Sequence, residues 1–258
     1  MKRSQFLQVA LDAAAAAAEV IRHYYRDDIE VSLKPDQTPV TQADVESERI
    51  IRKAIHDAFP DHGFYGEETG HEGLDAEYLW LVDPIDGTRS FVRGYPFFST
   101  QVALMHRGRV IVGVSSAPAF EQLAWAERGE GAFLDGHECH VSRIECLEEA
   151  AVSSGNLRTL ASGPRWSDWA EVVRRVARIR GYGDFYHYHL LASGRLEAVI
   201  ESDVNILDIA ALSLIVEEAG GIFADLDGRP VGLETTSVLA ANRHLYPAVA
   251  ALLRVPGA

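Results

Sequence analysis

Two aspartates, Asp83 and Asp86, lie three residues apart at the end of a short apolar run, Tyr78–Val82. Such a run is typical of a buried strand, which would carry both carboxylates to its end. Pro84 restricts the backbone and Gly87 permits conformations that other residues resist, so the pattern predicts a tight turn on which residues three apart face one point. Two carboxylates held that close repel each other unless a cation or a proton lies between them. The stretch is therefore a candidate metal site, and a surface turn with solvated aspartates is the alternative.

Two further acids could complete such a site. Glu67 precedes Asp83 by a loop length that allows it to return to the turn, and Asp208 lies in the first turn of an apolar helix expected from Leu207 to Glu218. Together with the aspartate turn they offer only oxygen ligands, which suit Mg²⁺ when water and a phosphate complete the shell. The carbonyl of Ile85 could add another ligand. Asp208 could instead serve only as a helix-start carboxylate, and the spacing does not fix the number of metal ions.

A phosphate could bind beside these acids. Arg89–Arg93 is expected to form a short helix whose first amides are those of Gly87 and Thr88, and free amides at a helix start bind anions. Asp44 follows Thr41 at the spacing of a capping box, so it is either a capping carboxylate or part of the site.

Other motifs give little support for a second functional site. The segment His137–His140 has soft metal ligands but no second pair, so zinc is not favoured there. His187 and His189 are two apart, which on a helix points them to opposite sides, and we expect packing or rim roles for both. Neither a dinucleotide-binding loop nor a nucleotide triphosphate loop is present.

The composition narrows the class of protein. The chain has 258 residues, a formal net charge of −14 and 47% hydrophobic residues, which indicates a globular protein with a large core. The negative charge and the lack of clustered basic residues argue against a nucleic-acid partner. Two cysteines, Cys139 and Cys146, form no disulfide framework, so we expect a reducing, cytoplasmic location. No segment has the apolar length of a membrane span.

The elements that must position these residues follow from periodicity. Apolar residues from Phe6 to Tyr24 have helical spacing, so we expect an amphipathic helix rather than a signal peptide. A loop is expected at 34–39, a helix from Thr41 to Phe59, and a division into an N-terminal half, 1–146, with most of the ligands and a C-terminal half, 147–258, with Asp208. Further strands are expected at 97–105, 109–115, 123–126, 131–134, 150–154, 196–200, 222–224 and 237–240, and further helices at 167–179, in 181–194 and at 244–253.

Four motifs in this order resemble the signatures of the inositol monophosphatase family: Gly66–Glu68, Trp80–Thr88, Leu207–Ala211 and Glu217–Gly221. The resemblance covers nearly the whole chain. It implies an α/β fold, the layered α/β/α/β/α sandwich of the inositol monophosphatase and fructose-1,6-bisphosphatase type. It also implies a Mg²⁺-dependent phosphomonoesterase acting on a small phosphorylated metabolite, often a lithium-sensitive homodimer.

The resemblance also implies roles for single residues. Glu67, Asp83, Asp86 and Asp208 would be the carboxylate ligands, with Glu67 also catalytic, and Ile85 would give a carbonyl. Thr88, paired with Asp44, would orient the attacking water, and the amides of Gly87 and Thr88 would hold the phosphate. One metal would activate that water and another would stabilise the leaving oxygen.

Two departures bear on the substrate. Inositol phosphatases commonly have D-G-T-T-N-F where this chain has Asp86–Phe91, with Arg89 and Ser90, and a small or uncharged residue where it has Asp184. Both departures resemble the histidinol-phosphate phosphatase branch. The acid at Asp184 also suits a cationic amine or imidazole better than a ring of hydroxyls. Glu201 could bind either substrate, and Ser154 would line the same pocket.

We therefore expect hydrolysis of L-histidinol phosphate, with a role in histidine biosynthesis. The alternatives are an inositol-1-phosphate phosphatase, a nucleotide 3′-phosphatase of the same superfamily, and a metal-binding regulatory protein without turnover.

Overall fold

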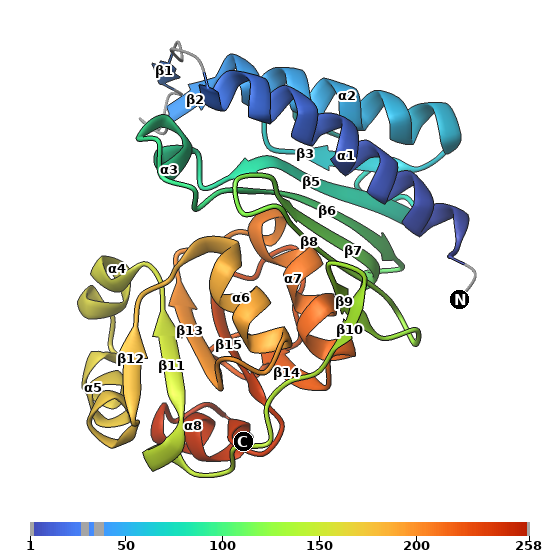
Figure 1. Cartoon of the computed structure of the whole chain (residues 1–258). Helices are drawn as coiled ribbons and strands as arrows, with labels where there is room; N and C mark the ends of the chain where they lie inside the picture. The colour runs from blue at the N-terminus through green and yellow to red at the C-terminus, as the bar shows by residue number, and fades with distance from the viewer. Residues whose placement is uncertain (1–2, 27–30, 34–38, 257–258) are drawn as a thin grey trace.

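Helices and sheets alternate in five layers in the computed structural model, which describes residues 3–26, 31–33 and 39–256 (Figure 1). The order of layers is helix pair, eight-stranded sheet, helix pair, five-stranded sheet and outer helices. This arrangement confirms the expected α/β/α/β/α sandwich. Of the loop expected at 34–39, residues 34–38 lie outside the described residues.

The first layer consists of α1 (Gln5–Arg26) and α2 (Gln42–Ala58). The face of α1 that packs on α2 and the sheet is rich in buried alanines, including Ala10, Ala14 and Ala17. Small side chains let the two helices lie close to each other and to the sheet beneath. The expected amphipathic helix is therefore present, and within the described residues no helix is long and apolar enough to span a membrane.

The larger sheet has the strand order β10-β9-β8-β7-β6-β5-β3-β4, in which only β3 and β5 run parallel. Alternate residues of its strand β5 (Tyr78–Asp86) face different layers: Leu79 and Leu81 pack toward the middle helices, and Trp80 and Val82 pack toward α1 and α2. The strands are β3 (Gly63–Gly66), β4 (His71–Glu72), β5 (Tyr78–Asp86), β6 (Ser99–His106), β7 (Arg109–Ala117), β8 (Gln122–Glu127), β9 (Ala132–Leu134) and β10 (His137–Cys139).

The middle layer consists of α6 (Asp184–Ala192) and α7 (Ile206–Glu218), which lie between the two sheets (Figure 1). Residues 209–216 of α7 are all buried, as expected of a helix that has a sheet on either side. Because α7 belongs to the second half of the chain but packs on β6 and β7, the two halves share one core. The boundary at 146 falls between the sheets and stays a prediction.

The smaller sheet has the order β12-β11-β13-β15-β14 and is covered on its outer side by α4, α5 and α8. Its strands are β11 (Ala151–Ser154), β12 (Arg178–Arg180), β13 (Ala198–Ser202), β14 (Gly221–Ala224) and β15 (Ser237–Asn242). The outer helices are α4 (Leu157–Ser162), α5 (Trp166–Arg175) and α8 (Tyr246–Leu252). Shorter elements are β1 (Val31–Leu33), β2 (Pro39–Thr41), α3 (Thr88–Val92) and a 3₁₀ turn, Leu147–Glu149.

One predicted helix was too long. The periodicity favoured a helix over 167–179, but α5 ends at Arg175 and Val176 is extended. Ile179 lies instead in β12, where it pairs with Val152 in a parallel register. The apolar residues at 176 and 179 fit the helical pattern only by coincidence, because they pack, partly buried, against the core of the smaller sheet.

Candidate active site

The aspartate pair lies in β5 itself rather than after it. The strand extends through Asp86, and its pairing with β6 shifts between Asp83, which faces Gln101, and Asp86, which faces Ser99. Three residues along β5 therefore span the same length as two residues along β6. This mismatch is a β-bulge, with one extra residue in β5. Strict alternation would place Asp83 and Asp86 on opposite faces, and Ile85 belongs to the core on the other side. The bulge lets both aspartates face the middle layer.

Asp208 meets the two aspartates from α7. One carboxylate oxygen from each of Asp83, Asp86 and Asp208 lies within 4.8 Å of the other two. A capping box fixes Asp208, which accepts hydrogen bonds from the backbone N–H of Asn205 at 2.9 Å and from its Nδ2 at 2.7 Å. Asp208 therefore caps its helix and also faces the other two acids, and its role as a metal ligand stays a prediction.

Glu67 reaches the same place from the end of β3. Its backbone N–H donates to Val82 O at 3.2 Å, and its side chain forms a hydrogen bond with Asp83. The buried carboxylate of Glu48 on α2 accepts from the next two amides, Glu68 N–H at 2.7 Å and Thr69 N–H at 2.6 Å. Glu48 therefore holds the loop that presents Glu67. The sequence analysis missed this residue, although an acid on the buried stripe of a helix is a detectable signal.

Burial and mutual repulsion make this cluster costly to ionise. Burial raises the pKa of Asp83 and of Asp86 well above the ordinary value, and neighbouring acids raise both further. Burial is also the main cause that raises the pKa of Asp208 to about 7, against two opposing hydrogen bonds from Asn205. A divalent cation would remove this repulsion and accept every oxygen ligand, so the residues fit a hard metal ion.

The side chains of Asp44 and Thr88 lie next to each other beside the acids. Asp44 is fully buried, caps α2 through Thr41, and accepts from the Thr88 hydroxyl at 3.2 Å. That hydroxyl also lies 3.0 Å from Ile85 O. Burial raises the pKa of Asp44, and the hydrogen bonds from Thr41 oppose the shift. Asp44 is thus both a capping carboxylate and a partner of Thr88.

A cavity of ≈ 250 Å³ opens over these groups. Gly87 precedes α3 with φ 88°, and a Cβ there would lie 2.5 Å from Phe97 O, so the turn requires glycine. Arg89 is exposed at the cavity. The lining comprises Glu67, Asp83, Ile85, Asp86, Gly87, Thr88, Arg89, Ser90, Asp184 and Asp208. Of the residues expected at the site, Ser154, Glu201 and Asp44 are outside this lining.

Asp184 approaches the cluster from the start of α6. It has φ 44°, a left-handed conformation that aspartate tolerates better than most residues, and follows Gly183. Burial and then the charge of Glu201 raise its pKa to about 6. Asp184 and Glu201 also raise the pKa of Asp86. The two acids expected to choose the substrate are therefore within electrostatic reach of each other and of the metal-site candidates.

The two histidines of α6 point to opposite sides, as predicted, but neither lies at a rim. His187 is fully buried and contacts Ser153 and Glu201. His189 lies 2.8 Å from the Ser115 hydroxyl on the other sheet, and burial lowers its pKa to about 3, so it is neutral. No local signal relates His187 to Glu201, because the contact joins a helix to a strand.

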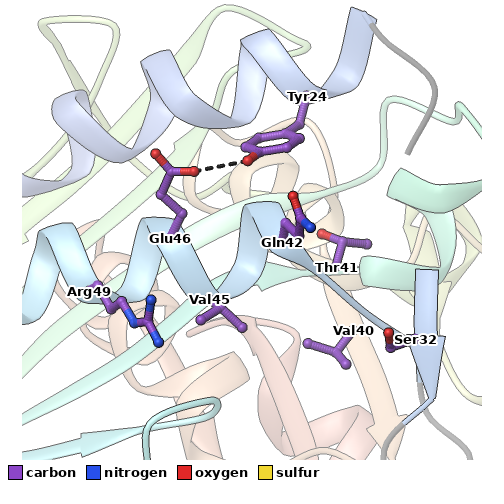
Figure 2. Close-up of a pocket in the computed structure, with 8 residues that line it drawn as sticks. All are labelled: Tyr24, Ser32, Val40, Thr41, Gln42, Val45, Glu46 and Arg49. Carbon is purple, nitrogen blue, oxygen red and sulfur yellow. Dashed lines mark hydrogen bonds between the residues drawn. The ribbon is translucent and has the colours of Figure 1, made fainter. Parts of the chain in front are cut away.

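Other candidates lack the chemistry of this site. In the segment 137–140, Cys139 is buried in the core while His137 and His140 are exposed. Figure 2 shows a larger cavity, of ≈ 430 Å³, between the end of α1 and the start of α2. Its only described carboxylate is Glu46, which accepts from the Tyr24 hydroxyl at 2.9 Å. Cavity volume alone therefore does not identify the site.

Comparisons with known proteins find similar sequences and similar folds. The model of the family described as "Inositol monophosphatase family" matches residues 2–255. A histidinol-phosphatase of Streptomyces coelicolor is 37% identical over 91% of both chains, and an inositol-1-monophosphatase of Rhizobium meliloti is 35% identical over 99% of this chain and 98% of its own. The crystal structure of the extragenic suppressor protein suhB from Bartonella henselae superposes with a TM-score of 0.90, at 32% identity, over 99% of this chain and 100% of that one.

Proposed function

The chain belongs to the inositol monophosphatase family and is a phosphatase, and from this premise we propose that it hydrolyses L-histidinol phosphate to L-histidinol and phosphate with Mg²⁺. The observation that carries the choice of substrate is Asp184, an acid in the wall of the cavity that already holds the metal-site candidates.

Glu67, Asp83, Asp86 and Asp208 would hold the metal, with the carbonyl of Ile85 as a further oxygen ligand. This proposal is supported by the all-oxygen set and by the raised pKa values of its aspartates. When bound, Mg²⁺ would lower the pKa of the attacking water and stabilise charge on the leaving oxygen.

The remaining groups would position water and phosphate. Asp44 accepts from the Thr88 hydroxyl, so the threonine oxygen has a lone pair available to receive a proton of the attacking water. The amides of Gly87 and Thr88 would hold the phosphate. The water would give one proton through the Thr88 hydroxyl to the Asp44 carboxylate while its oxygen forms a bond to phosphorus. The bond from phosphorus to the alcohol oxygen would break, and that oxygen would take a proton from solvent water to leave as the alcohol.

Asp184 and Glu201 would bind the amine or the imidazole of histidinol. Burial first and then the negative charge of Glu201 raise the pKa of Asp184 to about 6, so an ionised Asp184 is repelled by its neighbour. A cationic group between them would remove this repulsion, whereas a ring of hydroxyls would not. The histidinol-phosphatase of Streptomyces coelicolor supports the same choice.

The test is phosphate release at saturating Mg²⁺ from histidinol phosphate, inositol 1-phosphate and adenosine 3′,5′-bisphosphate. We expect the highest kcat/KM for histidinol phosphate, and Asp184→Asn should reduce that value more than the value for inositol 1-phosphate. A wild-type preference for inositol 1-phosphate would support the second candidate, inositol-1-phosphate hydrolysis, which the Rhizobium meliloti relative favours.

The assembly, location and metabolic role of the protein can be tested as well. We propose a homodimer in the cytoplasm that takes part in histidine biosynthesis. Sedimentation equilibrium would measure the mass of the assembly, and growth of a histidinol-phosphatase-deficient strain without histidine would test the role.

A further inference from the structure

The carboxylate of Glu201, at the end of β13, is held on one side by two donors from α6. Its Oε2 accepts from the Tyr188 hydroxyl at 2.8 Å and lies 3.1 Å from His187 Nε2. All three side chains are buried. An ionised carboxylate only accepts hydrogen bonds, so Nε2 must carry the proton in this contact.

Ser153 on β11 sets the orientation of the His187 ring. The backbone N–H of Tyr182 donates to Ser153 Oγ at 3.1 Å, and the same oxygen lies 3.2 Å from His187 Nδ1. In the neutral ring the serine hydroxyl donates to Nδ1, which leaves the proton on Nε2 to face Glu201. In the protonated ring both nitrogens donate, so Nε2 donates to Glu201 in either state.

The other oxygen of Glu201, Oε1, is held by close packing against Gly155. A Cβ on Gly155, which follows the end of β11, would lie 1.8 Å from Glu201 Oε1. The carboxylate therefore occupies the space that any larger residue at position 155 would take. Hydrogen bonds to one oxygen and close packing at the other leave Glu201 little freedom to rotate.

We infer that His187 is a positioning residue for substrate selection: oriented by Ser153, it holds Glu201 in the place from which that carboxylate contacts the alcohol part of the substrate. The inference rests on the proposed function in giving Glu201 this contact. His187 reaches the substrate only through Glu201, so its expected effect is on KM. Without it, the Tyr188 hydroxyl still binds Oε2, but the carboxylate can rotate about that one bond.

Three substitutions separate positioning from packing. His187→Gln keeps an N–H near the place of Nε2, His187→Asn keeps a polar group near Ser153 but does not reach Glu201, and Ser153→Ala frees the ring while leaving Glu201 untouched. For each variant and the wild type, kcat and KM are measured at saturating Mg²⁺ on histidinol phosphate and on phenyl phosphate, which offers no amine or hydroxyl to Glu201.

For His187→Asn we expect the ratio of kcat/KM between histidinol phosphate and phenyl phosphate to fall about tenfold, mostly through KM, as for loss of one hydrogen bond to a charged group. His187→Gln should recover most of the ratio, and Ser153→Ala should fall between the wild type and His187→Asn. An unchanged ratio in His187→Asn, or an equal loss on both substrates, overturns the inference. If the histidine variants do not fold, the ratio in Ser153→Ala decides.

The wild-type arm tests the proposed function separately. If the wild type prefers inositol 1-phosphate, histidinol phosphate is wrong as the substrate. The same ratios are then measured on inositol 1-phosphate, whose hydroxyls Glu201 can also bind, and an unchanged ratio there still overturns the role of His187.

Discussion

Replacing Asp83 by asparagine separates the effect of the acidic cluster on stability, through charge repulsion, from its effect on catalysis. The substitution keeps the shape of the side chain and removes one negative charge. The asparagine oxygen can still accept from the Ile85 N–H, which lies 2.9 Å from Asp83 Oδ1. We expect Asp83→Asn to lose at least about 100-fold in kcat with Mg²⁺, and to be more stable than the wild type when metal is removed.

The expected stabilisation follows from the geometry. The three aspartate oxygens lie within 4.8 Å of one another, and two full charges at that separation repel by roughly 3.5 kcal/mol at an effective dielectric constant of about 20. Partial protonation removes part of this repulsion, because the pKa values of Asp83 and Asp86 are raised well above the ordinary value. We therefore expect a gain of roughly 1–3 kcal/mol at pH 8, or about 2–10 °C in Tm for a chain of this size.

The pH dependence has a definite sign. Carboxyl groups whose pKa is raised by folding bind protons more tightly in the folded state than in the unfolded one. The folded, metal-free protein therefore binds more protons between the unfolded pKa near 3.8 and the folded value of about 7 for Asp208, and its stability falls as pH rises through this range. Asp83→Asn should show a shallower fall.

The assay is thermal unfolding in EDTA at pH 5 and pH 8, with phosphate release at saturating Mg²⁺ measured in parallel. Asp75→Asn, at an exposed residue of the loop before β5, is the matched control and should behave as the wild type in both. Wild-type turnover in Asp83→Asn, or a metal-free Tm at pH 8 below that of the wild type while Asp75→Asn is unaffected, would refute the assignment of this cluster.

Three more predictions concern neighbouring groups. Thr88→Val loses the hydroxyl that contacts Asp44, so kcat should fall about 100-fold with little change in KM; a normal kcat would exclude this role. Glu48→Gln weakens the hydrogen bonds that hold the loop carrying Glu67, so the Mg²⁺ concentration for half-maximal activity should rise about tenfold. An unchanged Mg²⁺ titration would count against this role of Glu48. Because the pKa of Asp184 is about 6, KM for histidinol phosphate should rise as pH falls below that value, whereas a KM that is flat in pH would contradict an ion pair with the substrate.

Local chemistry explains why much of the fold could be predicted. The start of α2 was predicted correctly because Thr41 and Asp44 satisfy helix amides by themselves, whatever packs around them. The buried helix α7 was predicted from its long apolar run. The end of α5 was missed because Ile179 joins a parallel strand pair, and parallel partners are distant in the sequence. The short strands β1, β2, β4 and β10 and the helix α4 have too few residues for a period to show.

The sequence alone determined which acids could form the site, the class of reaction that such acids support, and the cap that starts α2. Only the tertiary structure decided which of these acids meet. The bulge in β5 depends on its pairing with β6 and turns Asp83 and Asp86 to one face, where α7 presents Asp208. The contact between His187 and Glu201 likewise joins a helix to a strand. Residue spacing records local geometry, whereas these contacts depend on how whole layers pack.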